Sequence, residues 1–171
     1  MKTIADNAAY IIKRIKDVRN ESPGKKVLQK IVFLTIEKGI PFDYDFGLHF
    51  YGPYSSSLDE ATNILHAEGV IHFDYSGQSH KMEISDGFEV LPSKLTEEQI
   101  NDVNDVIQTF MDMSPSDLEL LTTAIYAFNH LDDKSKESVV SGVIKIKGKK
   151  YSPEKIYSAL NRFEYFNKVF S

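Results

Sequence analysis

Cysteine is absent from the 171 residues of the chain. Its absence excludes disulfide bonds, zinc sites built on cysteine, iron–sulfur clusters and thiol catalysis, and it is typical of proteins from a reducing cytosol. Long apolar runs are missing too, since none approaches the roughly 20 residues that a membrane helix needs. Charged residues such as Asp6 and Lys13 interrupt the first 20 residues, so no signal-peptide core forms there. The composition predicts a cytoplasmic protein of one or two small domains.

Motifs for nucleotide binding and covalent catalysis are also missing. The nearest approach to a phosphate-binding loop runs from Gly142 to Lys150. It has five residues between its glycines instead of four, and it lacks the Ser or Thr that would hold Mg²⁺. No G-x-S-x-G nucleophile turn occurs. We therefore expect a protein that is not an enzyme and uses no cofactor.

The histidines leave one minor alternative to that expectation. None of the five has the helical spacing of a metal site. Three histidines and two carboxylates lie in segments that could share a small sheet: His49, His72, His80, Asp74 and Asp86. A metal-dependent activity at such a cluster stays open, although exposed histidines at strand edges explain the pattern more simply.

Charge is unevenly distributed along the chain, whose net charge is −5. Residues 1–40 contain nine Lys and Arg against four Asp and Glu, and residues 141–171 contain seven against two. Residues 41–140 contain four against nineteen. Two interpretations are open: the basic ends pack beside the acidic middle and balance it, or they form a functional basic surface.

Apolar spacing predicts the first elements. Helical periodicity runs from Thr3 to Arg19, and a second helix covers KKVLQKIVFLTIEKG up to Gly39. The second helix is apolar around most of its circumference, so it should lie at the centre of the core. Alternating aromatic and acidic residues from Phe42 to Phe50 predict a strand.

The stretch FYGPYSSSLDE raises the question of whether it binds a ligand or only forms a structural corner. Gly52-Pro53 predicts a turn, and the serines predict a helix N-terminus, either by a capping box from Ser57 to Glu60 or from Ser56. This turn and capping chemistry favours the structural corner. Residues 70–90 follow as a predicted β-hairpin.

Three helix N-terminus signatures follow Pro92, at Thr96, at Ser114-Pro115 and at Ser152-Pro153. A further helix is predicted between Asp133 and about Lys145. The order of elements predicts an α+β, mostly helical protein. Residues 1–91 should form a winged-helix-like domain whose small antiparallel hairpin is the wing, and residues 92–171 a helical C-terminal bundle packed on it.

Three segments resemble a known family: LQKIVFL at residues 28–34, HFYGPYS at 49–55, and Leu65, Gly69 and Ile71 in an L-x3-G-x-I pattern. They are similar to the YwgA-like group of small bacterial and archaeal proteins, and more distantly to the Panacea domain, from which Tyr54 departs. The resemblance implies a winged-helix-like fold with appended helices and no catalytic residues. YwgA-like proteins are sometimes described as predicted regulators, and Panacea proteins are antitoxins that neutralise toxins by contact.

Nucleic acid is the usual ligand of a winged helix, and the helix before the wing usually reads it. Here that helix contains Asp59 and Glu60 and no Lys or Arg, so the phosphate backbone should repel it. Contacts to nucleic acid, if made, are expected from the basic ends. The candidates are Lys13, Arg14, Lys25, Lys26, Lys30, Lys145, Lys147, Lys149 and Lys150.

Two functions follow as hypotheses. The first is a regulatory or protein-interaction module, antitoxin-like in one version, whose partner surface comprises Tyr44, Tyr51, Tyr54, Asp59 and Glu60. Aromatic residues suit interface anchors, and acidic residues would face a basic partner. The second is a DNA-binding transcriptional regulator that uses the basic ends. Either function is compatible with a homodimer, and neither involves a membrane.

Overall fold

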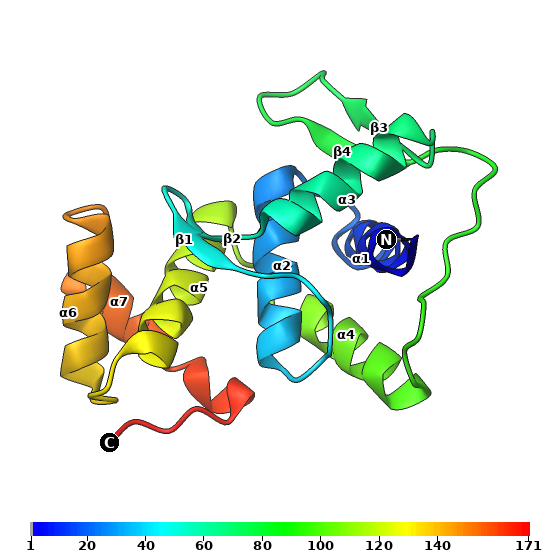
Figure 1. Cartoon of the computed structure of the whole chain (residues 1–171). Helices are drawn as coiled ribbons and strands as arrows, with labels where there is room; N and C mark the ends of the chain where they lie inside the picture. Colours follow the sequence, from blue (N-terminus) through cyan, green and yellow to red (C-terminus); the bar gives the residue numbers. More distant parts are fainter. Residues whose placement is uncertain (1) are drawn as a thin grey trace.

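The computed structural model describes residues 2–171. Over this range the chain forms seven α-helices, one 3₁₀ helix and two separate two-stranded antiparallel sheets (Figure 1). The helices are α1 (Lys2–Arg19), α2 (Lys25–Glu37), α3 (Ser56–Ala67), α4 (Glu97–Thr109), α5 (Pro115–His130), α6 (Lys136–Lys147) and α7 (Pro153–Leu160), and the 3₁₀ helix is η1 (Phe163–Phe166). The strands are β1 (Gly47–His49), β2 (Gly52–Tyr54), β3 (Ile71–Asp74) and β4 (Lys81–Ile84). The predicted α+β, mostly helical class is confirmed.

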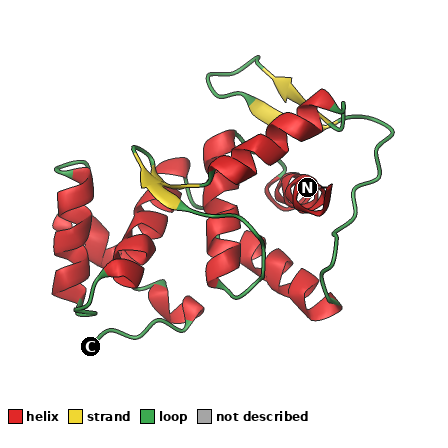
Figure 2. Ribbon diagram, in the orientation of Figure 1, coloured by secondary structure: helices red, strands yellow, loops and turns green. Residues whose placement is uncertain are grey.

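Helix α2 lies at the centre of the fold, as its sequence predicts. It contacts α1, α4, α5 and strand β2 (Figure 2). Nine consecutive residues, Val27 to Thr35, are buried, including the polar Gln29 and Lys30. The burial of α2 by these neighbours removes its apolar surface from water and so contributes to the stability of the N-terminal half.

Helices α4 and α5 connect the two halves of the chain. Helix α4 packs against α1 and α2, while α5 packs against α2 on one side and against α6 and α7 on another. Figure 1 shows α6 and α7 at the opposite end of the molecule from α1. Buried apolar residues from both halves form one continuous core. The division at residue 91 stays a prediction.

The strand predicted over residues 42–50 is wrong in most of its length. Residues 41–46 are irregular, although Phe42 and Tyr44 are buried. The alternation in this stretch therefore comes from single aromatic side chains that anchor the segment on the core, and within residues 2–171 no strand pairs with it. Strand β1 begins only at Gly47, and Phe50 lies in the turn that leads to β2.

The hairpin predicted within residues 70–90 is present as β3 and β4, with Ile71 opposite Ile84. A single β-bridge joins Gly24 to Lys81, and the Met82 amide donates to the Pro23 carbonyl at 2.8 Å. The hairpin is thereby attached to the segment between α1 and α2. The winged-helix interpretation itself stays a prediction.

The predicted N-caps Thr96, Ser114 and Ser152 are all confirmed, each accepting a backbone N–H with its side chain. The cap of α3 is neither Ser56 nor Ser57 but Ser55, whose Oγ accepts from the Leu58 amide at 3.2 Å. Within the described range, no helix is long and apolar enough to cross a bilayer.

Candidate basic-aromatic binding site

Polar side chains of α2 form hydrogen bonds with the backbone of the segment from Pro53 to Ser55. The Gln29 side chain donates to the Ser55 carbonyl at 2.9 Å and accepts from the Ser55 amide at 2.8 Å. The next residue, Lys30, donates from Nζ to the Pro53 carbonyl at 2.7 Å. Gln29, Lys30 and Ser55 are all buried. The amide and carbonyl of Ser55 and the carbonyl of Pro53 thus each have a partner, and the β1–β2 hairpin is fixed to α2 by polar side chains.

Gly52 brings this hairpin against α5. Its φ is +91°, a region that favours glycine. A Cβ at this position would lie 2.8 Å from Thr123 Oγ1 and 3.5 Å from both Glu119 Cγ and Lys30 Nζ. The backbone of β2 therefore approaches α5 as closely as a residue without a side chain allows.

Glu119 lies beneath the hairpin and is fully buried. Lys150 Nζ lies 2.6 Å from its Oε2, Lys147 Nζ 3.3 Å from the same oxygen, and Lys26 Nζ 2.8 Å from Oε1. The Tyr151 hydroxyl donates to Oε2 at 2.8 Å. Burial alone would raise the pKa of Glu119, but the hydrogen bonds from Lys150, Lys26 and Tyr151 and the charge of Lys147 lower it to about 2.

Lys30 adds a fourth ammonium group close to this carboxylate. Burial lowers its pKa to about 8, while the charge of Glu119 opposes that shift. Lys30 is therefore mostly protonated at neutral pH. Four ammonium groups surround one carboxylate, so the cluster of Lys26, Lys30, Lys147, Lys150 and Glu119 carries a positive excess. We call these five residues the lysine cluster.

The turn of the β1–β2 hairpin exposes two aromatic rings. Phe50 is 84% exposed and Tyr51 57% exposed, and the rings meet edge to face with centroids 4.9 Å apart. Lys26 and Lys150 place Nζ 5.1 and 5.9 Å from the Tyr51 ring centroid. We call Phe50 and Tyr51 the aromatic tip. A pocket of about 380 Å³ lies between the tip and α2.

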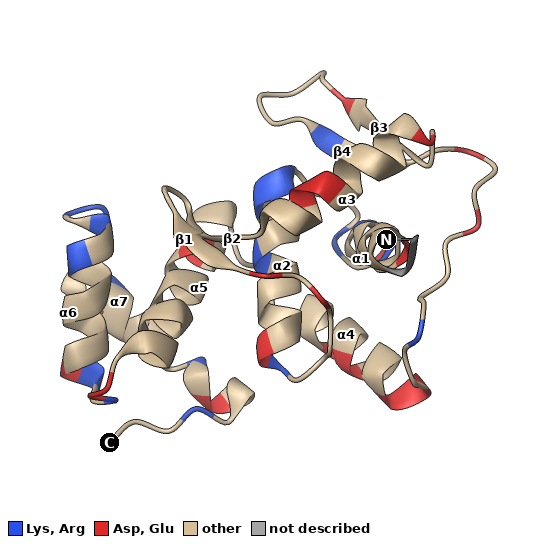
Figure 3. Ribbon diagram, in the orientation of Figure 1, with Lys and Arg blue, Asp and Glu red and all other residues tan. Residues whose placement is uncertain are grey.

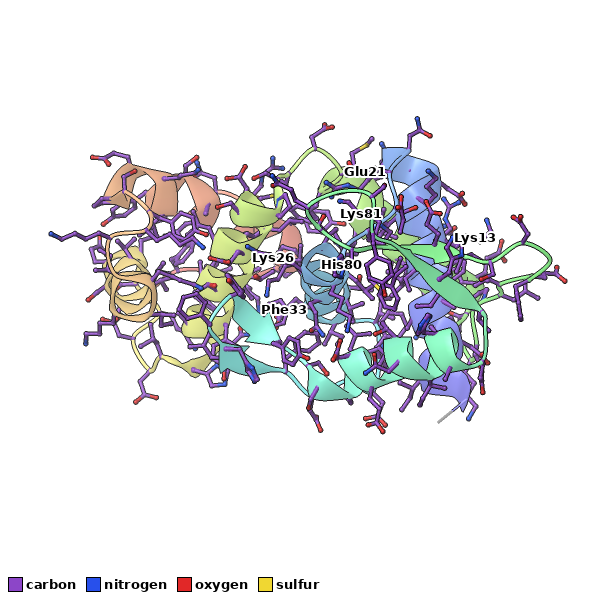
Figure 4. All side chains as sticks on the ribbon, turned by 90° about the horizontal axis from the view of Figure 1, so that it is seen from above. Lys13, Glu21, Lys26, Phe33, His80 and Lys81 are labelled. Atoms are coloured by element: carbon purple, nitrogen blue, oxygen red, sulfur yellow. The ribbon has the colours of Figure 1, made fainter. Side chains whose placement is uncertain are left out.

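The predicted nucleic-acid residues converge only in part. Figure 3 shows Lys and Arg at the start of α2 and at the end of α6, on either side of the β1–β2 hairpin. Figure 4, which looks down on this face, shows Lys26 near the middle and Lys13 far from it on α1. Lys13 and Arg14 both pair with Asp17 of their own helix.

Two of the predicted contacts need correction. Lys30 is buried, and the Lys147 side chain is only 5% exposed. Their ammonium groups are used to hold the hairpin, since Lys147 Nζ donates to the Phe50 carbonyl at 2.7 Å. Lys145 and Lys149, on either side of Lys147, are exposed, and among the described residues neither forms an ion pair.

The predicted partner surface also changes. Tyr44 is buried and its hydroxyl donates to the Ile4 carbonyl, so the prediction that it belongs to an exposed surface is wrong. Asp59 pairs with Lys25 at 2.8 Å, which joins one member of each predicted set. Tyr54 is half-buried, and Glu60 is exposed.

The structure does not bring the histidines together into a metal centre. Within residues 2–171, no three His, Asp or Glu side chains are placed to hold one ion. His72 contacts Glu83 and Ser85, His80 packs on Tyr75, and His49 packs on Tyr54.

Sequence reasoning missed Glu119, the central residue of the site. A signal for it exists in the sequence. The α5 segment PSDLELLTTAIYAF is apolar around nearly its whole circumference, so a single Glu in its middle has no side that faces water. A buried carboxylate needs cationic partners, and the basic C-terminal segment was the nearest supply along the chain.

No protein-family model matches the chain. A comparison with curated proteins finds the uncharacterised protein YwgA of Bacillus subtilis (strain 168), with 29% identity over 157 residues that cover 85% of this chain and 88% of YwgA. The relation to the Panacea domain stays a prediction. The similarity to YwgA extends over most of both chains, and it supports the family that the sequence motifs indicate, that of the YwgA-like proteins.

Proposed function

We propose that the protein is a non-enzymatic regulatory module that binds nucleic acid through the face formed by the lysine cluster, the aromatic tip, Lys145 and Lys149. One observation carries the proposal: the basic N-terminal and C-terminal segments, far apart in sequence, meet at the β1–β2 hairpin. Glu119 neutralises one positive charge, and the remaining excess attracts polyanions.

The protein-interaction hypothesis finds less support in the geometry. Burial removes Tyr44 from the predicted partner surface, and the ion pair with Lys25 neutralises Asp59. Tyr51 belongs to the basic face, where it lies under Lys26 and Lys150. The exposed residues that stay available around the hairpin are therefore basic and aromatic, a combination that suits phosphates and bases.

Fluorescence anisotropy with labelled single-stranded and duplex DNA, across a salt series, tests the proposal. We expect binding at low salt, and the logarithm of the association constant should fall linearly with the logarithm of the salt concentration. The double variant Lys145→Ala/Lys149→Ala should weaken binding and reduce the salt slope by about one unit or more, because each phosphate contact contributes about 0.7 to 0.9. Neither substitution removes an ion pair present in the structure.

The control is Lys13→Ala/Lys16→Ala, which removes the same formal charge from α1 and, with it, the exposed pair of Lys13 with Asp17. Figure 4 shows Lys13 far from this face. The control should leave affinity nearly unchanged. Absence of binding to either form of DNA at low salt, or an equal loss in the control, would overturn the proposal.

A further inference from the structure

The aromatic tip is built as a rigid platform. Lys147 holds the Phe50 carbonyl at 2.7 Å, Lys30 holds the Pro53 carbonyl at 2.7 Å, and Gly52 rests against α5. A turn that carries exposed rings would ordinarily be mobile. Here three attachments, to α6, α2 and α5, fix its backbone, so little conformational entropy is lost when a ligand contacts it.

The two rings of the aromatic tip differ in whether cations already lie near them. Lys26 and Lys150 lie near the Tyr51 ring, so Tyr51 is engaged by cations. Phe50 has no cation near its ring among the described residues, and 84% of its surface faces solvent. A Phe side chain stabilises a fold when it is buried. The Phe50 ring is almost fully exposed, so it adds no hydrophobic stabilisation that would account for its place on a fixed turn.

The surroundings of Phe50 are cationic. Lys147, which contacts its backbone, lies between the exposed Lys145 and Lys149 in the chain, and Lys26 and Lys150 flank its neighbour Tyr51. A free aromatic ring with ammonium groups at its backbone and over the neighbouring ring matches a base with its flanking phosphates. An acidic peptide would use the lysines, but its carboxylates would gain nothing from the Phe50 ring.

We infer that the site takes single-stranded nucleic acid, with an unpaired base stacked on Phe50 and the adjoining phosphates on the surrounding lysines. The inference rests on the proposed function and specifies its ligand. In a duplex the bases are paired and stacked on each other, so a base could stack on Phe50 only after it had left the helix. The exposed carboxylate of Glu60 on α3 further disfavours the broad phosphate surface of a duplex.

The test uses fluorescein-labelled oligothymidine of about 12 nucleotides and a duplex of the same length, with the full chain. We expect the single strand to bind at least about tenfold more tightly. Phe50→Ala should weaken single-strand binding by about 5- to 100-fold, the effect of losing one stacked base, with the salt slope unchanged because no phosphate contact is lost. Phe50→Trp should restore binding.

Phe88→Ala is the matched control, since Phe88 is also exposed and lies in the loop after β4. It should change affinity less than about twofold. Equal affinity for the duplex, or wild-type binding by Phe50→Ala, would refute the single-strand inference and leave the proposed function standing. Binding to neither DNA would refute both. Equal binding of a polyglutamate of similar charge, with the same dependence on Phe50, would indicate a protein partner and would also refute both.

Discussion

The two hairpins of the molecule are attached to it in opposite ways. The β3–β4 hairpin is anchored by the buried apolar side chains of Ile71 and Met82 together with backbone contacts to Pro23 and Gly24, and its turn carries small polar residues. The β1–β2 hairpin is anchored by buried polar side chains, and its turn carries exposed aromatic rings.

The two kinds of attachment should differ in how they respond to the loss of a charge. Apolar anchors stabilise a hairpin in proportion to the area they bury and are insensitive to charge. Polar anchors depend on each partner being present, since a buried group left alone costs its full desolvation free energy. Removal of a single charge beneath the β1–β2 hairpin should therefore be strongly destabilising, whereas removal of a charge near the β3–β4 hairpin should not.

Removing the charge of Glu119 should break the comparison most severely. Glu119→Gln leaves Lys26, Lys147 and Lys150 without their anion, and we expect the free energy of unfolding to fall by about 4 kcal/mol. Urea unfolding followed by circular dichroism measures the loss. Asp117→Asn, two residues away, removes only the exposed pair with Lys155 and should cost at most about 1 kcal/mol. Similar costs for the two variants would contradict the buried anchoring.

A methyl group in each hairpin sharpens the comparison. Gly52→Ala forces a side chain into positive φ and against Thr123 Oγ1, and we expect a loss of about 3 kcal/mol in unfolding free energy. Gly77→Ala, in the β3–β4 turn, meets only the Ser79 carbonyl oxygen at 3.9 Å and should change stability by about 0.5 kcal/mol or less. Thermal denaturation measures the difference. Equal melting temperatures for the wild type and both variants would refute the close packing of β2 on α5.

Acid should lower the free energy of unfolding through Glu119, and this is the smallest of the expected effects. The folded-state pKa of Glu119, about 2, lies below the ordinary value of 4.5 for a glutamate, so its stabilisation is present above pH 4.5 and is lost as pH falls toward 2. Between pH 5.5 and 3.5 this residue alone should account for a loss of about 1 kcal/mol. The measurement is the difference in pH dependence between the wild type and Glu119→Gln, which cancels the other carboxylates. Parallel pH curves would show that Glu119 titrates normally.

Local patterns predicted much of the fold. The caps at Thr96, Ser114 and Ser152, the all-round burial of α2 and the β3–β4 hairpin are each set by residues within one turn or one pair of strands. The errors fall where distant contacts decide. Ser55 became the cap of α3 because Gln29, 26 positions earlier, fixes its backbone.

The candidate site was predictable only as two separate lists. Basic residues and the aromatic corner are visible in the sequence, but no local signal shows that Lys26 and Lys150 meet over Tyr51. Nor does periodicity separate Lys30, which is buried, from Lys26, which keeps contact with solvent, since both lie on the same polar strip of α2.

By itself the sequence determined the class of the fold, the beginnings of the C-terminal helices and the uneven distribution of charge, because capping, periodicity and composition act over a few residues. Only the tertiary structure decided that the corner HFYGPYS is both a structural joint and an exposed aromatic tip. The physical reason is the buried carboxylate of Glu119: it pairs with Lys26 from the N-terminal part of the chain and with Lys150 from the C-terminal part, and ion pairs between residues so far apart in sequence leave no trace in local spacing.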